Sequence, residues 1–194
     1  MRAMKTQFEH AYVLSVMSDD HPGIVAAVSD AINRRGGNID ACSQTVLGGY
    51  FTLIMIVSTP QPVEPDELSA QIGSAGAAAR GLQVIVRPFV ASRESARDAA
   101  QQFVITAFGS DKPGIIHVIS QYLAGKDINI GDFYWERTDG EFVMVSQVAI
   151  PPARDIAMLQ ADLEQIGERE GFNIRLQHEN IFVATNQLRL TASK

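Results

Sequence analysis

The chain has 194 residues, of which 46% are hydrophobic and 20% are charged, the composition of an ordinary globular protein with a buried core. Its formal net charge of −6 argues against direct nucleic-acid binding, which needs Lys and Arg to neutralise phosphates. The single cysteine, Cys42, excludes an intramolecular disulfide and a multi-cysteine metal site. No apolar run reaches the roughly 18 residues of a membrane span, so we expect a cytoplasmic protein without a membrane partner.

One segment of the chain occurs twice. Residues 20–25 read DHPGIV and residues 111–116 read DKPGII, at an offset of 91. The same offset pairs Asn38 with Asn129 and Phe51 with Phe142. A period of this size is too long for a solenoid repeat of roughly 20 to 50 residues, so it predicts a duplicated small domain.

The duplication divides the chain into five parts. We expect two domains of about ninety residues each. A polar and alanine-rich linker joins them, and its composition is also compatible with a short helix. The expected boundaries are an N-terminal tail at 1–9, a first domain at 10–91, a linker at 92–101, a second domain at 102–187 and a C-terminal tail at 188–194.

The first copy begins with a strand that leads into a helix. The β-rich run 12–17 ends at a polar turn, and Pro22 has the fixed φ that suits the first position of a helix. Glycines 36 and 37 are then expected to end that helix. One helical stripe is formed by the apolar residues Ile24, Val25, Val28, Ala31 and Ile32.

Two strands, a second helix and a last strand follow. In the first copy these elements are predicted at 38–46, 50–57, 66–79 and 82–90, and in the second at 129–137, 141–150, 155–169 and 172–177. The glycine turns between the paired strands predict hairpins. Each copy therefore has the order βαββαβ. We predict an α+β protein of two ferredoxin-like domains, each an antiparallel sheet with helices on one face.

The third strand of the first copy is unusually apolar. Residues 51–57 read FTLIMIV, almost without the polar alternation of a strand that has one wet face. This pattern predicts that both faces of the strand are buried. The second domain, a second chain or both would supply the cover, and we expect a homo-oligomer.

The turn before the first helix is the candidate ligand site. Free backbone N–H groups near Gly23 and Ile24, with the positive end of the helix dipole, suit a carboxylate. Asp20 would meet the ammonium of an α-amino acid, and Asn38, expected to converge with Asp20, would bridge to either end of the zwitterion. A side chain at position 23 would hold the ligand away from the backbone. A purely structural interpretation stays open, because Asp before Pro-Gly starts helices and Asn after glycines is a common turn residue.

Other reactive side chains give weaker signals. Cys42 is interpreted as a small strand hydrophobe, and the four histidines lack metal-ligand spacing, so no metal or cofactor is expected. The run Phe133-Tyr134-Trp135 suits packing in a sheet better than a stacking surface. No nucleophile with a base and no phosphate-binding glycine loop emerges, so the chain is not expected to be an enzyme.

The pattern Asp-x-Pro-Gly-Ile, an amphipathic helix, Gly-x-Asn-Ile and a glycine-turned hairpin resembles the ACT domain. Two copies with the segment 43–51, SQTVLGGYF, are similar to tandem-ACT proteins related to the glycine cleavage system transcriptional repressor. The segment is also similar to the amino-terminal part of formyltetrahydrofolate deformylases, whose hydrolase domain has no room here. ACT domains bind amino acids or related metabolites at interfaces between ACT units, so the resemblance implies regulation rather than catalysis.

The resemblance also implies which residues contact a ligand. In the first copy they are Ser18, Asp20, Pro22, Gly23, Ile24 and Asn38, and in the second copy Gly109, Asp111, Pro113, Gly114 and Asn129. Two departures are expected to weaken the second copy. Asp127 stands where the first copy has Gly36, and the bulky run 133–135 is matched with Ala41-Cys42-Ser43. The two sites should therefore differ in affinity or specificity.

Two functions follow from these observations. The leading hypothesis is a sensor of a small amino acid, with glycine as first candidate, that signals to a protein partner such as a transcription factor. The alternative is an ACT-based docking or dimerisation scaffold without a functional ligand site. An RNA-recognition module has the same element order, but the third strands lack its basic and aromatic signature.

Overall fold

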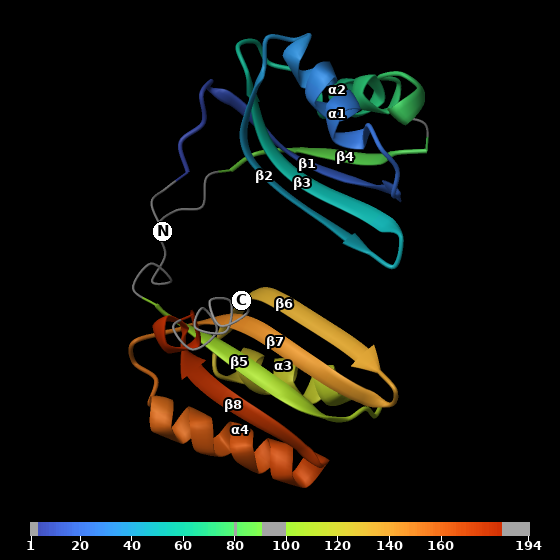
Figure 1. The fold of residues 1–194 in the computed structure, drawn as a ribbon. Helices are drawn as coiled ribbons and strands as arrows, with labels where there is room; N and C mark the ends of the chain where they lie inside the picture. The colour runs from blue at the N-terminus through green and yellow to red at the C-terminus, as the bar shows by residue number, and fades with distance from the viewer. Residues whose placement is uncertain (1–3, 80, 91–99, 184–194) are drawn as a thin grey trace, which may run out of the picture. The chain divides into compact units, whose positions relative to one another are not determined.

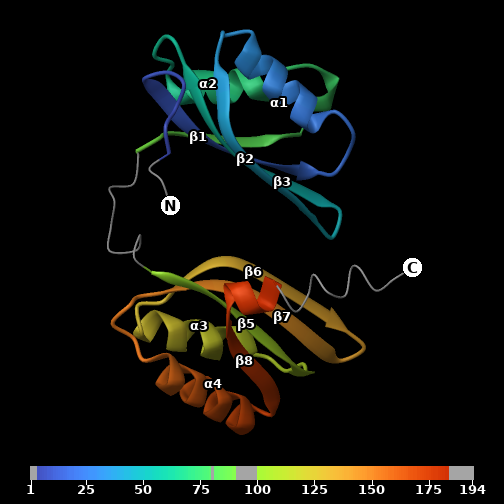
Figure 2. The same cartoon turned by 60° about the vertical axis from the view of Figure 1, so that its left-hand side comes forward.

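The computed structural model describes residues 4–79, 81–90 and 100–183, which form two compact units (Figures 1 and 2). Unit 1 contains the first repeat and unit 2 the second, with the division between residues 93 and 94. A helix in the linker and the C-terminal tail from residue 188 lie outside the described residues.

Unit 1 confirms the predicted βαββαβ order. Its sheet has the strand order β2-β3-β1-β4, and every neighbouring pair is antiparallel. The elements are β1 (His10–Asp19), α1 (Ile24–Asn33), β2 (Asn38–Leu47), β3 (Tyr50–Thr59), α2 (Pro65–Gly73), the 3-10 turn η1 (Ala77–Ala79) and β4 (Gln83–Pro88).

The prediction of one helix over 66–79 is wrong. The helix α2 ends at Gly73, and the chain then passes through Gly76 at φ +99° into η1. Glycine adopts this left-handed conformation at little cost, so the two glycines end the helix early. The separate turn η1 matters below, because it lies against the start of α1.

Unit 2 repeats the order with longer helices. Its sheet has the strand order β6-β7-β5-β8, again antiparallel throughout. The second helix, α4, is capped by Asp155, which accepts a hydrogen bond from Met158 N, and it ends at the left-handed Gly171. The elements are β5 (Gln101–Ser110), α3 (Ile115–Gly125), β6 (Asn129–Thr138), β7 (Glu141–Ile150), α4 (Ile156–Glu170) and β8 (Phe172–His178).

Each unit has its own core between its sheet and its helices, which lie together on one face of the sheet (Figure 1). Leu14, Leu53 and Ile72 are at most 1% exposed in unit 1, as are Ile105 and Met144 in unit 2. Burying a side chain of this size contributes about 1.5–3 kcal/mol. Two separate cores confirm that the duplicated sequence encodes two folding units.

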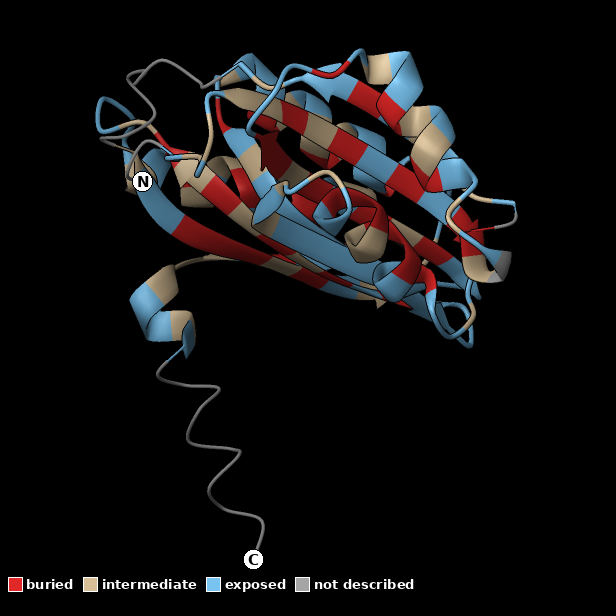
Figure 3. Ribbon diagram, turned by 90° about the horizontal axis from the view of Figure 1, so that it is seen from above, coloured by how far each residue is buried: buried red, intermediate tan, exposed pale blue. Residues whose placement is uncertain are grey.

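Along the third strand of unit 1, buried residues alternate with more exposed ones more regularly than the sequence suggests (Figure 3). Leu53 and Met55 are buried against the helices, whereas Ile54 points to the open face of the sheet and is 55% exposed. The predicted burial of both faces is therefore not met within the described residues. Cover of that face by the second domain, a second chain or both stays a prediction.

The two hairpins confirm the turn signals and correct one residue match. Both tips have positive φ at two consecutive residues, Gly48-Gly49 and Asp139-Gly140, as type I′ hairpins require. Trp135 pairs with Met144 across its hairpin, and Gln44 pairs with Leu53 at the equivalent place. The bulky run 133–135 therefore replaces Cys42-Ser43-Gln44, and the predicted match to residues 41–43 was one residue out of register.

The two edges of each sheet differ. On the fourth strands, side chains from the second helix bind the backbone: Ser69 Oγ donates to Val84 O at 2.8 Å, and Gln160 Oε1 accepts from Leu176 N at 2.9 Å. At the opposite edges, β2 and β6 are exposed at nearly every residue.

Candidate functional site

The first strand of each unit enters the first helix through the same backbone turn. Gly23 and Gly114 both have φ 99° and ψ −7°, and neither helix has a side-chain cap. The first helical bonds are Ala27 N to Gly23 O and Val118 N to Gly114 O, so the N–H groups before them have no partner within the helix. These glycines are thus required by the backbone conformation itself, a reason that the sequence did not reveal.

The turn is fastened to the tip of the neighbouring hairpin. Asp20 N donates to Gly49 O, and Asp111 N donates to Gly140 O, both at 2.8 Å. The Asp111 carboxylate also forms an ion pair with Arg137 on β6, with 2.8 Å between Oδ2 and Nε. Ser18, predicted to contact ligand, is buried and donates its hydroxyl to the backbone oxygen of Asp19.

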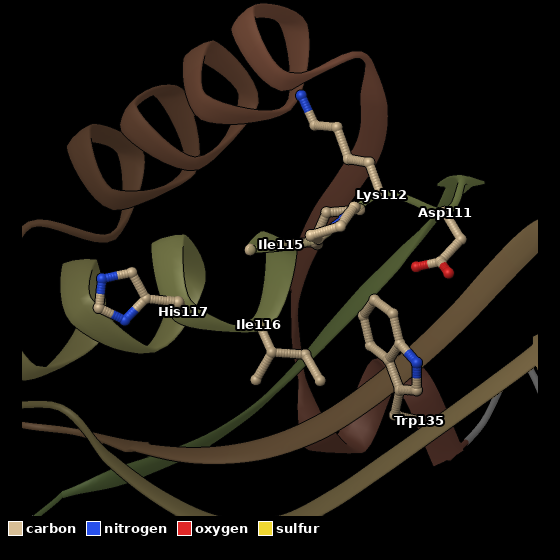
Figure 4. Close-up of a pocket in the computed structure, with 8 residues that line it drawn as sticks. Asp111, Lys112, Ile115, Ile116, His117 and Trp135 are labelled. Carbon is tan, nitrogen blue, oxygen red and sulfur yellow. The ribbon is translucent and has the colours of Figure 1, made fainter.

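Unit 2 has a pocket in front of the first turn of α3 (Figure 4). Its volume is about 500 Å³, and the predicted residues Asp111, Pro113 and Gly114 contribute to its wall. Figure 4 shows the Asp111 carboxylate directed toward the indole of Trp135, with Ile116 beside the ring. The remaining lining residues are Lys112, Ile115 and His117. The pocket combines free backbone donors, a carboxylate and an apolar wall.

An aromatic row supports this pocket from below. The Trp135 ring stacks on Phe142 with 4.4 Å between centroids and 7° between planes, and Phe142 meets Phe172 edge to face at 5.7 Å. Gly109 on β5 pairs with both phenylalanines in the sheet register. A Cβ at this glycine would lie 2.9 Å from Phe172 Cβ, so Gly109 makes room for the rings. This contact explains Gly109, which was predicted to touch ligand, as a packing residue.

The corresponding turn in unit 1 is more crowded. A Cβ built on Gly23 would lie 3.2 Å from Ala78 Cβ of η1, whereas a Cβ on Gly114 would meet nothing within 4 Å. The second helix of unit 2 continues straight and has no such turn. The expectation that the second copy has the weaker site is therefore not supported by the space at the two turns.

The predicted convergence of Asp20 with Asn38 is wrong within one unit. Asn38 pairs with Ser58 at one end of β3, but Asp20 is bonded to Gly49 beyond the other end. In unit 2, Asn129 pairs with Ala149, nine residues beyond the Gly140 that holds Asp111. At roughly 3.3 Å per residue, about 30 Å separates the two ends.

The two asparagines also make local contacts. Asn38 Nδ2 donates to Asp40 Oδ1 at 2.8 Å, and the same oxygen accepts from Gln7 N. Asn129 Nδ2 donates to Ile130 O at 3.2 Å. Both asparagines are exposed at the start of the edge strands.

Polar contacts of α4 with α3 and with the turn before it hold unit 2 together. Lys112 in the turn binds Glu170 at the end of α4 with 2.9 Å between Nζ and Oε2, and Lys112 with Arg169 lowers the pKa of Glu170. Tyr122 on α3 donates to Asp162 on α4, and this bond together with Lys126 lowers the pKa of Asp162. Burial and the nearby Asp162 carboxylate raise the pKa of Tyr122.

Two further features bear on function. Among residues 4–79, 81–90 and 100–183, no group of three or more His, Cys, Asp or Glu side chains could hold a metal ion. Within the same residues, no helix has the length and hydropathy needed to cross a membrane.

The family model of the ACT domain matches residues 10–79 and 101–177, which are the two repeats. The chain belongs to the ACT-domain family. As an ACT-domain regulatory protein it contains two copies of the ACT unit. It is 39% identical to the UPF0237 protein MJ1558 of Methanocaldococcus jannaschii over 80 residues, covering 41% of this chain and 89% of the relative. It is 33% identical to the UPF0237 protein CPE1496 of Clostridium perfringens over 86 residues, covering 44% and 97%.

Two solved structures match both ACT units. A protein of unknown function from Galdieria sulphuraria has a TM-score of 0.72 and 27% identity, covering 87% of this chain and 98% of its own. A protein described as a candidate glycine cleavage system transcriptional repressor has a TM-score of 0.66 and 17% identity, covering 87% and 96%. At that identity the second match shows a shared tandem fold.

Proposed function

We propose that this ACT-domain protein senses an α-amino acid and passes its occupancy to a protein partner, such as a transcription factor. The observation that carries the proposal is the pocket of unit 2, where Asp111 lies beside the unpaired N–H groups at the start of α3. The α-carboxylate of the ligand would accept from those N–H groups, and its ammonium would donate to Asp111. A zwitterion supplies both charges in one small molecule.

The affinity expected for a small amino acid suits a sensor of metabolite concentration. Glycine has about five heavy atoms, and a ceiling of about −1.5 kcal/mol per atom limits its binding to about −7.5 kcal/mol. The dissociation constant for glycine is then no tighter than a few micromolar. To act as a switch, the ligand must also bind one arrangement of the protein better than another, with a typical coupling of about 1–3 kcal/mol.

A second copy of the chain would explain the distance between Asp111 and Asn129. If β6 of one copy pairs antiparallel with β6 of another, the start of one strand lies beside the end of the other. Asn129 of the second copy would then lie near Asp111 of the first, and each site would use both copies. The exposed backbone of β6 makes it available for such pairing.

Ligand binding tests the sensor. Trp135 is the single tryptophan of the chain and lines the pocket, so its fluorescence reports occupancy directly. We expect at least one amino acid to change this fluorescence and to raise the melting temperature of the full chain with increasing concentration. Asp111→Asn should weaken binding roughly tenfold, since a charged hydrogen bond is lost. The matched variant Asp20→Asn in unit 1 should leave the affinity within about twofold.

Mixing two defective variants tests the shared site. Asp111→Asn and Asn129→Ala should each bind poorly alone. In a mixed dimer one site carries both substitutions and the other carries neither, so an equimolar mixture should regain tight binding at a fraction of its sites. Continued weak binding after the two variants have exchanged subunits would contradict the shared site and leave Asp111 acting within one unit.

The scaffold alternative also has an observation in its favour. Met17, Ile54 and Ile85 lie on the open face of the unit 1 sheet and are 42%, 55% and 61% exposed. Such a face fits a protein-docking surface. If no amino acid at millimolar concentration changes either the fluorescence or the melting temperature, the scaffold replaces the sensor.

A further inference from the structure

We propose that Trp135 makes the unit 2 pocket selective for α-amino acids with a large, flat and apolar side chain, the class represented by phenylalanine, over glycine. This inference rests on the proposed function, because it names the ligand class of the same pocket. It differs from the expectation of glycine that the sequence suggested.

The pocket has a charged part and an apolar part. Asp111 and the start of α3 provide the carboxylate and the backbone donors. The opposite wall consists of the Trp135 indole and of Ile116, which is 42% exposed (Figure 4). An amino acid whose charged groups occupy the polar part has the indole as neighbour for its side chain.

The Trp135 indole is held in place by packing against Phe142. One face of the ring is covered by Phe142 at 4.4 Å in a nearly parallel stack, and Phe142 is only 1% exposed. Phe172 packs on Phe142 in turn, across the gap that Gly109 leaves. A ring held by two layers of packing loses little freedom on binding, so it is a preorganised surface for another ring.

Unit 1 does not have this aromatic wall at the equivalent register position. Gln44 occupies the register position of Trp135, and Phe51 occupies that of Phe142. Ala78 crowds the turn at Gly23 as well. The repeat therefore kept the inner phenylalanine and changed the residue at the position of Trp135, which lines the pocket of unit 2.

Glycine gains nothing from the aromatic wall, because it has no side chain to place against it. Burying a phenyl ring against an indole adds apolar area and an aromatic contact, which together favour the larger ligand by roughly tenfold or more. The volume of about 500 Å³ accommodates an amino acid of that size.

Calorimetric titration of the full-length chain with phenylalanine and with glycine tests the inference. The wild type should bind phenylalanine at least about tenfold tighter than glycine. Trp135→Gln introduces the residue of unit 1, and it should abolish this preference by weakening phenylalanine binding about tenfold. Trp135→Phe keeps an aromatic face and should retain most of the preference. The matched variant Gln44→Trp should leave both affinities unchanged, since Ala78 crowds the turn at Gly23.

Each outcome separates the selectivity from the sensing function. Binding of both amino acids with equal affinity, lost in Asp111→Asn, would overturn the role of Trp135 and leave the sensor intact. An unchanged preference in a folded Trp135→Gln variant would overturn it as well, and circular dichroism checks the folding. If neither of these two binds but another amino acid does, the selectivity falls and the sensor stands; if no amino acid binds, both fall.

Discussion

The two ACT units have the same backbone plan, but they differ in what lies in front of their first helix. Both helices begin at a glycine with the same φ and ψ, and both turns are hydrogen-bonded to the adjacent hairpin tip. In unit 1 the short turn η1 puts Ala78 against Gly23, whereas in unit 2 the space is open and bordered by Trp135. The repeated segment thus fixes the turn, and residues outside it decide whether the turn has room for a ligand.

Substitution of Gly109 is expected to give the largest difference in stability between equivalent variants of the two units. Gly109→Ala brings a Cβ within 2.9 Å of Phe172 Cβ and 3.1 Å of its Cα, so the aromatic row must shift. We expect a loss of about 2 kcal/mol in the free energy of unfolding. Urea unfolding followed by Trp135 fluorescence measures it. Ser18→Ala, at the equivalent position of unit 1, should cost about 0.5 kcal/mol; losses of equal size would show that the row tolerates a methyl group.

The two helix-start glycines give an intermediate effect. Gly23→Ala and Gly114→Ala both force alanine into φ 99°, which costs about 1–2 kcal/mol. Gly23→Ala additionally meets Ala78, so we expect it to be about 0.5–1 kcal/mol more destabilising than Gly114→Ala. Urea unfolding of both variants, read by circular dichroism, compares them. A greater loss for Gly114→Ala would contradict the crowding in unit 1.

Replacing Asp127 with glycine is expected to raise the free energy of unfolding, by a smaller amount than the losses above. It ends α3 at φ 56°, where Gly36 has φ 66° in unit 1. Because glycine adopts this conformation with less strain, Asp127→Gly should stabilise unit 2 by about 0.5–1 kcal/mol, and Gly36→Asp should destabilise unit 1 by a similar amount. Thermal unfolding of each variant checks the sign. Destabilisation by Asp127→Gly would indicate a contact of the carboxylate that outweighs the strain.

The pair between Lys112 and Glu170 gives the smallest effect, because exposed ion pairs contribute little. The lowered pKa of Glu170 means that its contribution is present above the ordinary glutamate pKa and is lost as the pH falls through the folded value. Glu170→Gln should therefore be slightly less stable than wild type at pH 7, and the difference should vanish in acid. Unfolding free energies across this pH range measure it; a gap that widens in acid would contradict the pairing.

The sequence predicted the fold well because the repeat doubled each signal. The strand-to-helix turns, the hairpin glycines and the helical stripes each occurred twice at one offset, and the structure places them as βαββαβ in both units. The end of α2 was missed, since the alanine-rich stretch continued the helical pattern past Gly73. Tertiary packing of η1 against Gly23 leaves no periodic signal in the sequence.

The geometry of the candidate site was predicted in part. Asp111, Pro113 and Gly114 do share one pocket, as their adjacency in the sequence suggested. The position of Asn38 was wrong because α1 carries the chain back along the sheet, so β2 starts at the end where β1 also starts. That return follows from the antiparallel order and was open to prediction. Contact between Trp135 and the turn depends on the strand register and was not.

The difference between the two sheet edges limits how far each sheet can be extended. Ser69 and Gln160 occupy backbone groups of β4 and β8, so another strand arriving there would first have to displace them. Each four-stranded sheet can then accept a neighbour along one margin only. A sheet that joins another along β2 or β6 therefore ends as a ribbon of eight strands.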